Sequence, residues 1–145
     1  MQLERSFFEI LMNFFYPQYR ILSNYRIANY EYDIILESTE QPQLDFIFEI
    51  KYYPTGYRKN SFKEAITHLS KSTEAYIDVT RRKAKPLLLI VMQKNEEINL
   101  DELSDINEIR KLREFKNAMM TIVSFDELET ITKDRIEKVM DMTLK

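Results

Sequence analysis

The N-terminal segment has polar and apolar positions at helical spacing. Residues 2–16 are nearly all apolar except for one narrow polar face, which is made of Gln2, Ser6, Glu9 and Asn13. The pattern predicts a helix that ends before Pro17. At about 100° per residue, Glu4 lies almost opposite the polar face, grouped with Phe8, Leu11 and Phe15. We therefore expect Glu4 to face inward.

Three runs rich in Tyr, Ile and Phe follow, and short polar breaks separate them. They cover residues 19–29, 30–38 and 44–53, and they predict strands that pair as an antiparallel meander. The only glycine, Gly56, lies close to Pro54 and marks a loop after the third strand. Ser61 and Glu64 have the spacing of a capping box, which predicts a helix from Ser61 to about Arg82.

The C-terminal part continues the alternation of strands and helices. Residues 85–92 form a short run that is wholly apolar after Lys85, which is typical of a strand buried on both faces. We predict a loop over 95–101, a charged amphipathic helix over 103–117 and a strand over 118–125. Ser124 and Glu127 form a second capping box, which opens a last helix over 126–142.

These elements give the order α-β-β-β-α-β-α-β-α. The pattern predicts an α/β fold in which a central mixed sheet, including an antiparallel β-meander, is flanked by helices on both sides. With 145 residues, the chain has the size of one domain, and we expect residues 1–145 to fold as one.

The register of the second and third strands follows from the need to keep each face uniform. One face becomes wholly apolar when Ile34 lies opposite Phe48 and Leu36 lies opposite Phe46. The same register places Ile35 opposite Ile47 and Asp33 opposite Glu49, with Lys51 next along that second face. Registers shifted by two residues keep the same faces. The alternation therefore determines which side chains share a face, but it leaves the distance between Asp33 and Glu49 open.

Composition narrows the chemistry that such a site can carry. The chain has no cysteine, which excludes disulfides, zinc–thiolate sites and thiol nucleophiles, and one histidine, which excludes a multi-histidine metal site. A net charge of −3 gives no global attraction to nucleic acid, so such binding needs local basic patches. Charged residues interrupt the apolar N-terminus, so we expect no membrane segment and a cytoplasmic location.

Two carboxylates that oppose each other on a sheet repel unless a positive charge lies between them. A divalent cation or Lys51 can supply that charge. Carboxylate oxygens at this density suit Mg²⁺ or Mn²⁺. Such an ion supports phosphodiester hydrolysis, in which Lys51 would orient the attacking water or stabilise the transition state.

With Asp33, the Glu49-Ile50-Lys51 tripeptide and a glutamate on the first helix, residues 1–92 resemble the PD-(D/E)xK nuclease superfamily, whose fold is called restriction-endonuclease-like. The run from Tyr19 to Tyr53 resembles small resolvase-like and restriction-like members in particular. The resemblance implies that Asp33, Glu49, the Ile50 carbonyl and Glu4 bind the metal and that Lys51 is catalytic. The chain departs from the family in having Tyr32 where a proline often precedes the aspartate, and in lacking glycines around it.

Further residues are candidates for contacts with the substrate. A group of aromatic and basic residues follows the third strand and could contact the phosphates and bases of a nucleic acid. An ordinary solvated loop can have the same composition. We assign nucleic-acid binding to Tyr53, Tyr57, Arg58, Lys59 and Lys63. His68 stands near the position of a Gln-Leu pair in some relatives, and we expect a supporting role for it.

The sequence therefore leads to two hypotheses. The first is a Mg²⁺-dependent endonuclease that hydrolyses DNA phosphodiester bonds and works as a homodimer or beside a targeting partner or domain. The second is a nuclease-like fold that only binds protein or nucleic acid, in which Lys51 neutralises Asp33 and Glu49 as a structural ion-pair cluster.

Overall fold

The computed structural model describes residues 2–93, 98, 107, 108, 110 and 118–144. Its elements are α1 (Gln2–Phe15), β1 (Tyr19–Ile27), β2 (Tyr30–Ser38), β3 (Asp45–Tyr53), α2 (Lys59–Thr80), β4 (Ala84–Met92), β5 (Met119–Ile122), α4 (Phe125–Glu129) and α5 (Lys133–Leu144). The predicted loop over 95–101 and the predicted helix over 103–117 lie almost wholly outside the described residues. No helix in the described ranges combines the length and the apolar character needed to cross a bilayer.

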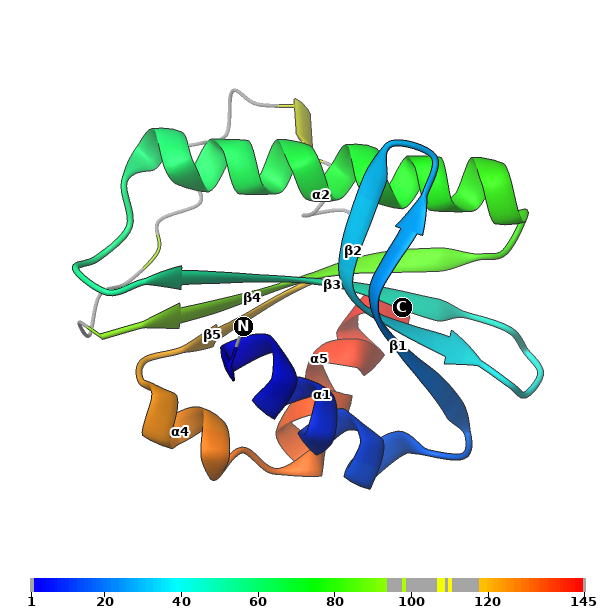
Figure 1. Ribbon diagram of the computed structural model, residues 1–145, viewed down its shortest axis with the longest axis horizontal. Helices are drawn as coiled ribbons and strands as arrows, with labels where there is room; N and C mark the ends of the chain where they lie inside the picture. Colours follow the sequence, from blue (N-terminus) through cyan, green and yellow to red (C-terminus); the bar gives the residue numbers. More distant parts are fainter. Residues whose placement is uncertain (1, 94–97, 99–106, 109, 111–117, 145) are drawn as a thin grey trace.

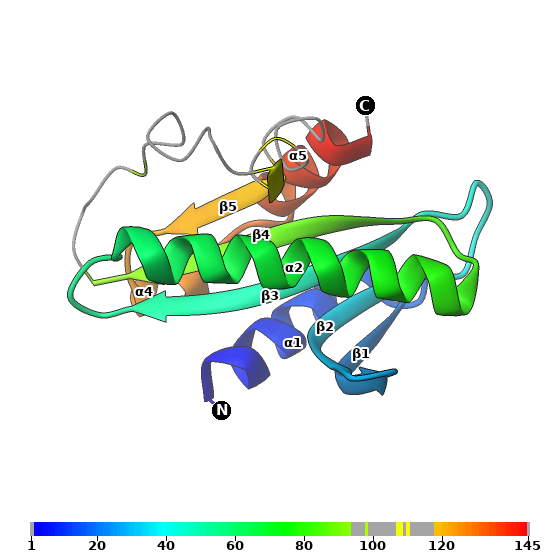
Figure 2. The same cartoon turned by 90° about the horizontal axis from the view of Figure 1, so that it is seen from above.

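The five strands form one mixed sheet in the order β1-β2-β3-β4-β5. The β1–β2 and β2–β3 pairs are antiparallel, and the β3–β4 and β4–β5 pairs are parallel. Helices cover both faces of the sheet (Figures 1 and 2). The predicted α/β class is therefore confirmed. The predicted register is confirmed as well, because Ile34 pairs with Phe48, Ile35 with Ile47 and Leu36 with Phe46.

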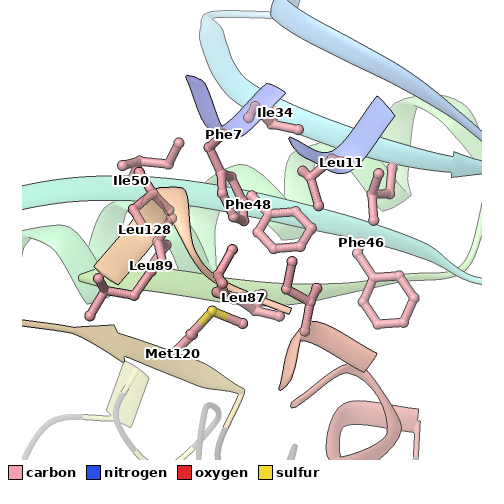
Figure 3. Close-up of a cluster of buried hydrophobic side chains, with 14 of the residues drawn as sticks. Phe7, Leu11, Ile34, Phe46, Phe48, Ile50, Leu87, Leu89, Met120 and Leu128 are labelled. Carbon is pink, nitrogen blue, oxygen red and sulfur yellow. The ribbon is translucent and has the colours of Figure 1, made fainter. Parts of the chain in front are cut away.

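One face of the sheet packs against α1, α4 and α5. Figure 3 shows the apolar side chains that meet there, with Phe7 and Leu11 of α1 above Phe46, Phe48 and Leu87 of the strands. The rings of Phe7 and Phe48 lie edge to face with their centroids 5.5 Å apart. The apolar face predicted from the alternation in β2 and β3 is therefore the floor of this core.

Among the described helices, α2 covers the other face of the sheet. Phe62, Ile66 and Leu69 of α2 are fully buried against Ile35 and Ile47. Successive residues of β4 enter the two cores in turn, as Leu87 and Leu89 join the first core and Leu88 and Ile90 join the second. The prediction that this strand is buried on both faces is confirmed, since seven of its side chains from Pro86 to Met92 are buried.

The β1–β2 hairpin bends toward α2 (Figure 1). Ile34 belongs to the core beneath α1, but Tyr32 packs in the α2 core, and its hydroxyl donates a 2.7 Å hydrogen bond to the Ser72 carbonyl. Strict alternation would put residues 32 and 34 on the same face. Across from this point, Asn24 has a left-handed backbone with φ of 49°. The hairpin therefore twists sharply here, and Asp33 lies at the twist.

Helix α2 begins two residues before the predicted start. Its N-cap is Arg58, and no side chain caps it, so the capping box predicted from Ser61 and Glu64 is wrong. Tyr57 precedes the N-cap, and its ring packs on Phe62 with centroids 5.4 Å apart. This pair has the positions of a hydrophobic staple, which sets where the helix starts. The helix ends at Thr80 rather than Arg82, because Arg81 takes a left-handed conformation.

The last helix predicted over 126–142 is two helices, α4 and α5. The break falls on the β-branched run Thr130, Ile131 and Thr132, which disfavours helix. The Thr132 hydroxyl accepts a hydrogen bond from the Arg135 N–H and caps α5. The capping box at α4 is confirmed, because Ser124 accepts from the Glu127 N–H, while the Glu127 carboxylate accepts from the Val123 N–H. The predicted strand over 118–125 is limited to β5.

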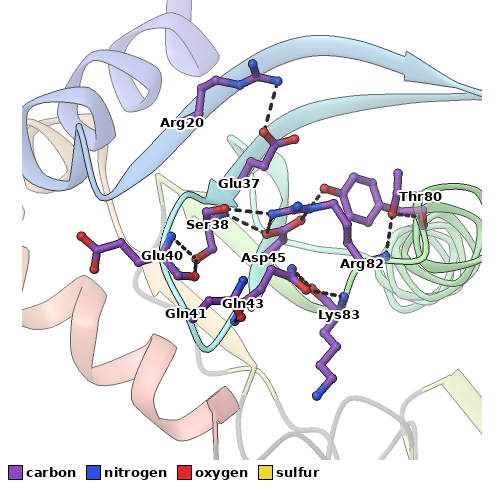
Figure 4. A network of polar contacts seen from close by, with 11 residues as sticks. Arg20, Glu37, Ser38, Glu40, Gln41, Gln43, Asp45, Thr80, Arg82 and Lys83 are labelled. Carbon is purple, nitrogen blue, oxygen red and sulfur yellow. Dashed lines mark hydrogen bonds and ion pairs between the residues drawn. The ribbon is translucent and has the colours of Figure 1, made fainter.

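A buried ion pair closes the end of the sheet where β3 begins (Figure 4). Asp45 is fully buried, and Arg82 donates to both of its carboxylate oxygens at 2.7 and 3.0 Å. The Tyr76 hydroxyl and the Ser38 N–H also donate to Asp45, at 2.5 and 2.9 Å. Burial alone raises the pKa of Asp45, but these hydrogen bonds outweigh it and hold the pKa below its usual range.

Candidate active site

Asp33 and Ile50 connect β2 to β3 just beyond their backbone pairing. The pairing runs as far as Ile34 and Phe48, and at the next step the Asp33 carboxylate accepts a 2.8 Å hydrogen bond from the Ile50 N–H. The Ile50 side chain is buried in the α1 core. The hydrogen bond anchors the Asp33 carboxylate at the edge of the Glu49-Ile50-Lys51 peptide, as expected for residues of one site.

Glu49 carries the most unusual carboxylate in the described structure. Its side chain is only 9% exposed, and Oε1 lies 2.6 Å from His68 Nδ1 and 3.9 Å from Lys51 Nζ. An ionised carboxylate offers only acceptors, so His68 Nδ1 is the donor. The second oxygen, Oε2, is buried and has no hydrogen-bond partner within the described residues. A buried oxygen without a partner is costly, and a cation beside it would remove that cost.

The three candidate carboxyl groups all have raised pKa values. Burial is the main cause of the increase for Asp33, Glu49 and Glu4. The charge of Asp33 adds to the increase for Glu49 and Glu4, while Lys51 opposes it at all three groups. The carboxylates are therefore close enough to repel one another, and Lys51 offsets this repulsion only in part.

Glu4 lies in the first turn of α1 and is partly exposed. The buried stripe of α1 consists of Leu3, Phe7, Leu11 and Phe15, so Glu4 borders this stripe rather than facing fully inward as predicted. Its pKa is sensitive to Asp33 and Lys51, which places its carboxyl within electrostatic reach of the site.

Lys51 and His68 approach Glu49 from two elements. Lys51 projects from β3 with a side chain that is 43% exposed, and His68 projects from α2 with a side chain that is 47% exposed. The ring of Tyr30, at the start of β2, packs on the His68 imidazole with centroids 5.7 Å apart. Both groups can therefore reach solvent and Glu49 at once, and Tyr30 fixes the imidazole from the third element.

Tyr30 did not emerge from the sequence as a member of the site. Its side chain reaches His68 only because the hairpin bends toward α2, and local alternation does not predict that bend. The one available signal was its position at the first residue of a strand that carries Asp33.

The aromatic and basic group predicted to bind nucleic acid separates into two parts. Tyr53 and Tyr57 are partly buried and pack against the α2 core. Arg58 and Lys59 are exposed, and Lys63 is partly exposed. The tyrosines therefore have a structural role in the α2 core, and the two exposed cations offer the more accessible part of this surface.

The donor set can be tested against the metal that the resemblance implies. No three His, Asp or Glu side chains within the described ranges form a ready-made metal site. Mg²⁺ keeps several waters and commonly takes only one or two protein carboxylates. Asp33, Glu49 and the Ile50 carbonyl supply hard oxygen ligands of this kind, and Glu49 Oε2 has no other described partner. The residues fit such an ion.

The contact between His68 and Glu49 gives a first prediction. Replacing His68 by alanine is expected to raise the pKa of Glu49 further, because the hydrogen bond and charge of His68 both lower it in the native protein. Replacing His68 by asparagine keeps a donor near the position of Nδ1 and should restore part of the effect. Carboxyl ¹³C NMR titration measures both. A Glu49 pKa that is equal in the native protein and the alanine variant would show that the contact is electrostatically unimportant.

Comparison of this chain with protein-family models, with curated proteins and with solved structures finds no significant match.

Proposed function

We propose that this protein is a Mg²⁺-dependent endonuclease of the PD-(D/E)xK type that hydrolyses DNA phosphodiester bonds, on a restriction-endonuclease-like fold. The observation that carries the proposal is the buried Oε2 of Glu49, which has no hydrogen-bond partner among the described residues and lies in the same cluster as Lys51 and Asp33. A cluster of carboxyl groups with raised pKa values lowers the stability of a folded protein at neutral pH, and clusters of this kind are concentrated at functional sites.

In this proposal Asp33, Glu49 and the Ile50 carbonyl hold Mg²⁺ or Mn²⁺, with Glu4 at the border of the site. Residues that hold such an ion would gain from it Lewis-acid chemistry toward the phosphoryl oxygen and toward a water molecule. Lys51 places its half-exposed ammonium where negative charge develops on the phosphate, and it stabilises that charge or orients the attacking water. His68 holds the Glu49 carboxylate through Oε1 and leaves Oε2 free.

The DNA backbone would be bound mainly by Arg58 and Lys59, the exposed cations at the start of α2. Two cations supply little of the binding free energy that a protein of net charge −3 needs. We therefore expect a homodimer, or action beside a targeting partner or domain, in the cytoplasm.

A second function is favoured by one specific contact. Glu49 Oε1 accepts from His68 and lies within ion-pair distance of Lys51. The same cluster is therefore compatible with a structural ion-pair network in a nuclease-like fold that only binds protein or nucleic acid. The unpartnered Oε2 favours the nuclease, because a network of purely structural origin would be expected to satisfy both oxygens.

Cleavage assays on supercoiled, branched and single-stranded DNA with Mg²⁺, Mn²⁺ or EDTA test the proposal. We expect cleavage with Mg²⁺ or Mn²⁺ and none with EDTA. Replacing Lys51 by alanine is expected to lower the rate by roughly 10²–10³-fold, the usual loss when one group that stabilises transition-state charge is removed. Lys71, an exposed lysine on α2, provides a matched control, and its alanine variant should cut at the native rate.

The proposal fails if the native protein cuts none of these substrates and calorimetry detects no binding of Mg²⁺ or Mn²⁺. The binding-module function would then account for the cluster. Equal rates for the Lys51 and Lys71 variants would remove Lys51 from the mechanism.

A further inference from the structure

A groove of about 840 Å³ runs between the first half of α1 and the middle of β1. Its lining consists of Glu4, Arg5, Ser6, Phe8, Glu9, Ser23 and Asn24. Two strand residues of this lining, Ser23 and Asn24, lie across the β1–β2 hairpin from Ile34 and Asp33. The groove therefore opens directly beside the candidate active site, and its volume is within the range of pockets that bind small organic groups.

Asn24 connects the far wall of the groove to Asp33. Ser23 pairs with Ile34 and Tyr25 pairs with Tyr32, so Asn24 lies across from Asp33 in the β1–β2 hairpin. Asn24 has a φ of 49°, in the left-handed region that costs most residues about 1 kcal/mol or more and that asparagine tolerates best after glycine. This backbone conformation places Asn24 at the twist of the hairpin, on the wall of the groove.

The polar groups of the groove are suited to a neutral partner. Ser23 and Asn24 are exposed and Ser6 is partly exposed, so the Asn24 amide and the two hydroxyls can reach a ligand. The charged groups disfavour an anion, because Glu4 and Glu9 are acidic and the one cation, Arg5, lies 3.8 Å from Glu9. A phosphate is therefore a poor occupant. A nucleobase is neutral, presents several donors and acceptors, and can lie against the partly buried ring of Phe8.

Base pairing decides which kind of DNA can supply such a base. In a duplex the hydrogen-bonding edges are paired and the rings are stacked inside the helix, so a base enters a side pocket only when it is unpaired. We propose that this groove holds the base of an unpaired nucleotide next to the phosphodiester bond that is cut, and that single-stranded segments of DNA are the preferred substrate. This inference rests on the proposed nuclease function and specifies its substrate.

The test compares binding and cleavage of one oligonucleotide as a single strand and as a duplex. Binding is followed by fluorescence anisotropy in EDTA, where cleavage is not expected, and cleavage is followed separately with Mg²⁺. We expect at least tenfold tighter binding of the single strand. Replacing Asn24 by glycine keeps the left-handed backbone accessible and removes only the amide, and it should weaken single-strand binding about tenfold without changing duplex binding.

Two further variants provide a second test of the groove and a control. Ser6→Ala combined with Ser23→Ala removes two hydroxyls from the groove and should also weaken single-strand binding selectively. Asn13→Ala removes an exposed amide from the same helix outside the groove and should bind like the native protein. Circular dichroism of each variant verifies that the fold is intact.

The outcomes separate this inference from the proposed function. Cleavage that depends on Lys51 but is equal on both substrates and insensitive to Asn24→Gly overturns the groove inference and leaves the nuclease standing. Binding that is selective for the single strand and sensitive to Asn24→Gly, without any cleavage, supports the groove as a base-binding site and overturns the nuclease. A native protein that binds neither substrate in EDTA and cuts neither with Mg²⁺ contradicts both.

Discussion

Replacing Glu49 by glutamine is expected to lower the rate of Mg²⁺-dependent cleavage by about 10²-fold or more and, at the same time, to raise the free energy of unfolding. The loss of activity follows because the variant removes a negative ligand from the site. The gain in stability follows because the folded protein raises the pKa of Glu49, mainly through burial, so that the ionised side chain opposes folding. Glutamine keeps the shape and an oxygen for His68 while it removes the buried charge.

The pH dependence of this gain has a definite sign. Below the ordinary glutamate pKa of 4.5, the native side chain is protonated in both the folded and the unfolded states, so glutamine has no advantage. As the pH rises above 4.5, the unfolded state ionises first and the native protein loses stability. The advantage of the variant should therefore be present at pH 7 and shrink as the pH is lowered.

Urea denaturation at pH 7 and pH 4 measures the free energies of unfolding, and single-turnover assays measure the cleavage rate. Glu64→Gln is the matched control, because Glu64 is exposed on the same helix as His68 and should change neither quantity. Native-like cleavage by the Glu49 variant would remove Glu49 from the site. A variant that is clearly less stable than the native protein at pH 7 would contradict the electrostatic cost assigned to this carboxylate.

Replacing Arg82 by alanine is expected to lower the free energy of unfolding by about 3–5 kcal/mol at pH 7. The variant leaves the Asp45 carboxylate fully buried without the guanidinium that donates to both of its oxygens. Breaking a buried pair by removing one partner has an effect of this size because an uncompensated charge remains inside. Asp45 lies four residues before Glu49 on β3, roughly 13 Å away at about 3.3 Å per residue, so the folded variant should retain its cleavage activity.

Acid pH should reduce the effect of the Arg82 substitution. In the native protein the pKa of Asp45 lies below its ordinary 3.8, so the pair stabilises the fold above that pH and ceases to do so as the pH falls through the lowered pKa. Chemical denaturation at pH 7 and pH 3 tests this dependence. Arg82→Lys keeps the charge without the planar fork and should lie between the native protein and alanine. A loss below about 1 kcal/mol that is the same at both pH values would show that the network contributes little.

The sequence by itself predicted the layers of this fold and which side chains of β2 and β3 share a face. Period-2 alternation placed Ile34 and Phe48 on one face, because a slip by one residue would expose one apolar face and bury charges on the other. The structure then selected the pairing of Ile34 with Phe48 from the registers that keep these faces. The run Pro86 to Met92 identified the strand buried on both faces. The cap at Ser124 was also predictable, because capping needs only neighbours in the chain.

Local patterns failed where a distant packing contact competed with them. Ser61 and Glu64 have the spacing of a capping box, yet α2 starts at Lys59, and Phe62 is buried in the core that α2 forms with Ile35 and Ile47 of the sheet. Arg82 belongs to the basic run from Arg81 to Lys85, which no local pattern connects to a carboxylate, yet it pairs with the buried Asp45 of β3. In both cases the deciding partner is recognised only when the strands and the helix are already in place.

For the candidate site, the sequence determined which side chains were available, and the tertiary structure decided how they meet. Alternation and helical spacing singled out Asp33, Glu49, Lys51 and Glu4, since those patterns depend only on local backbone geometry. Tertiary packing decided that Glu49 is buried with one oxygen on His68 and the other without a described partner. It also bent the hairpin so that Tyr30 reaches His68 and Asn24 lines a groove beside Asp33. These contacts join elements far apart in the chain, and only the packing of α1 and α2 on opposite faces of one twisted sheet brings them together.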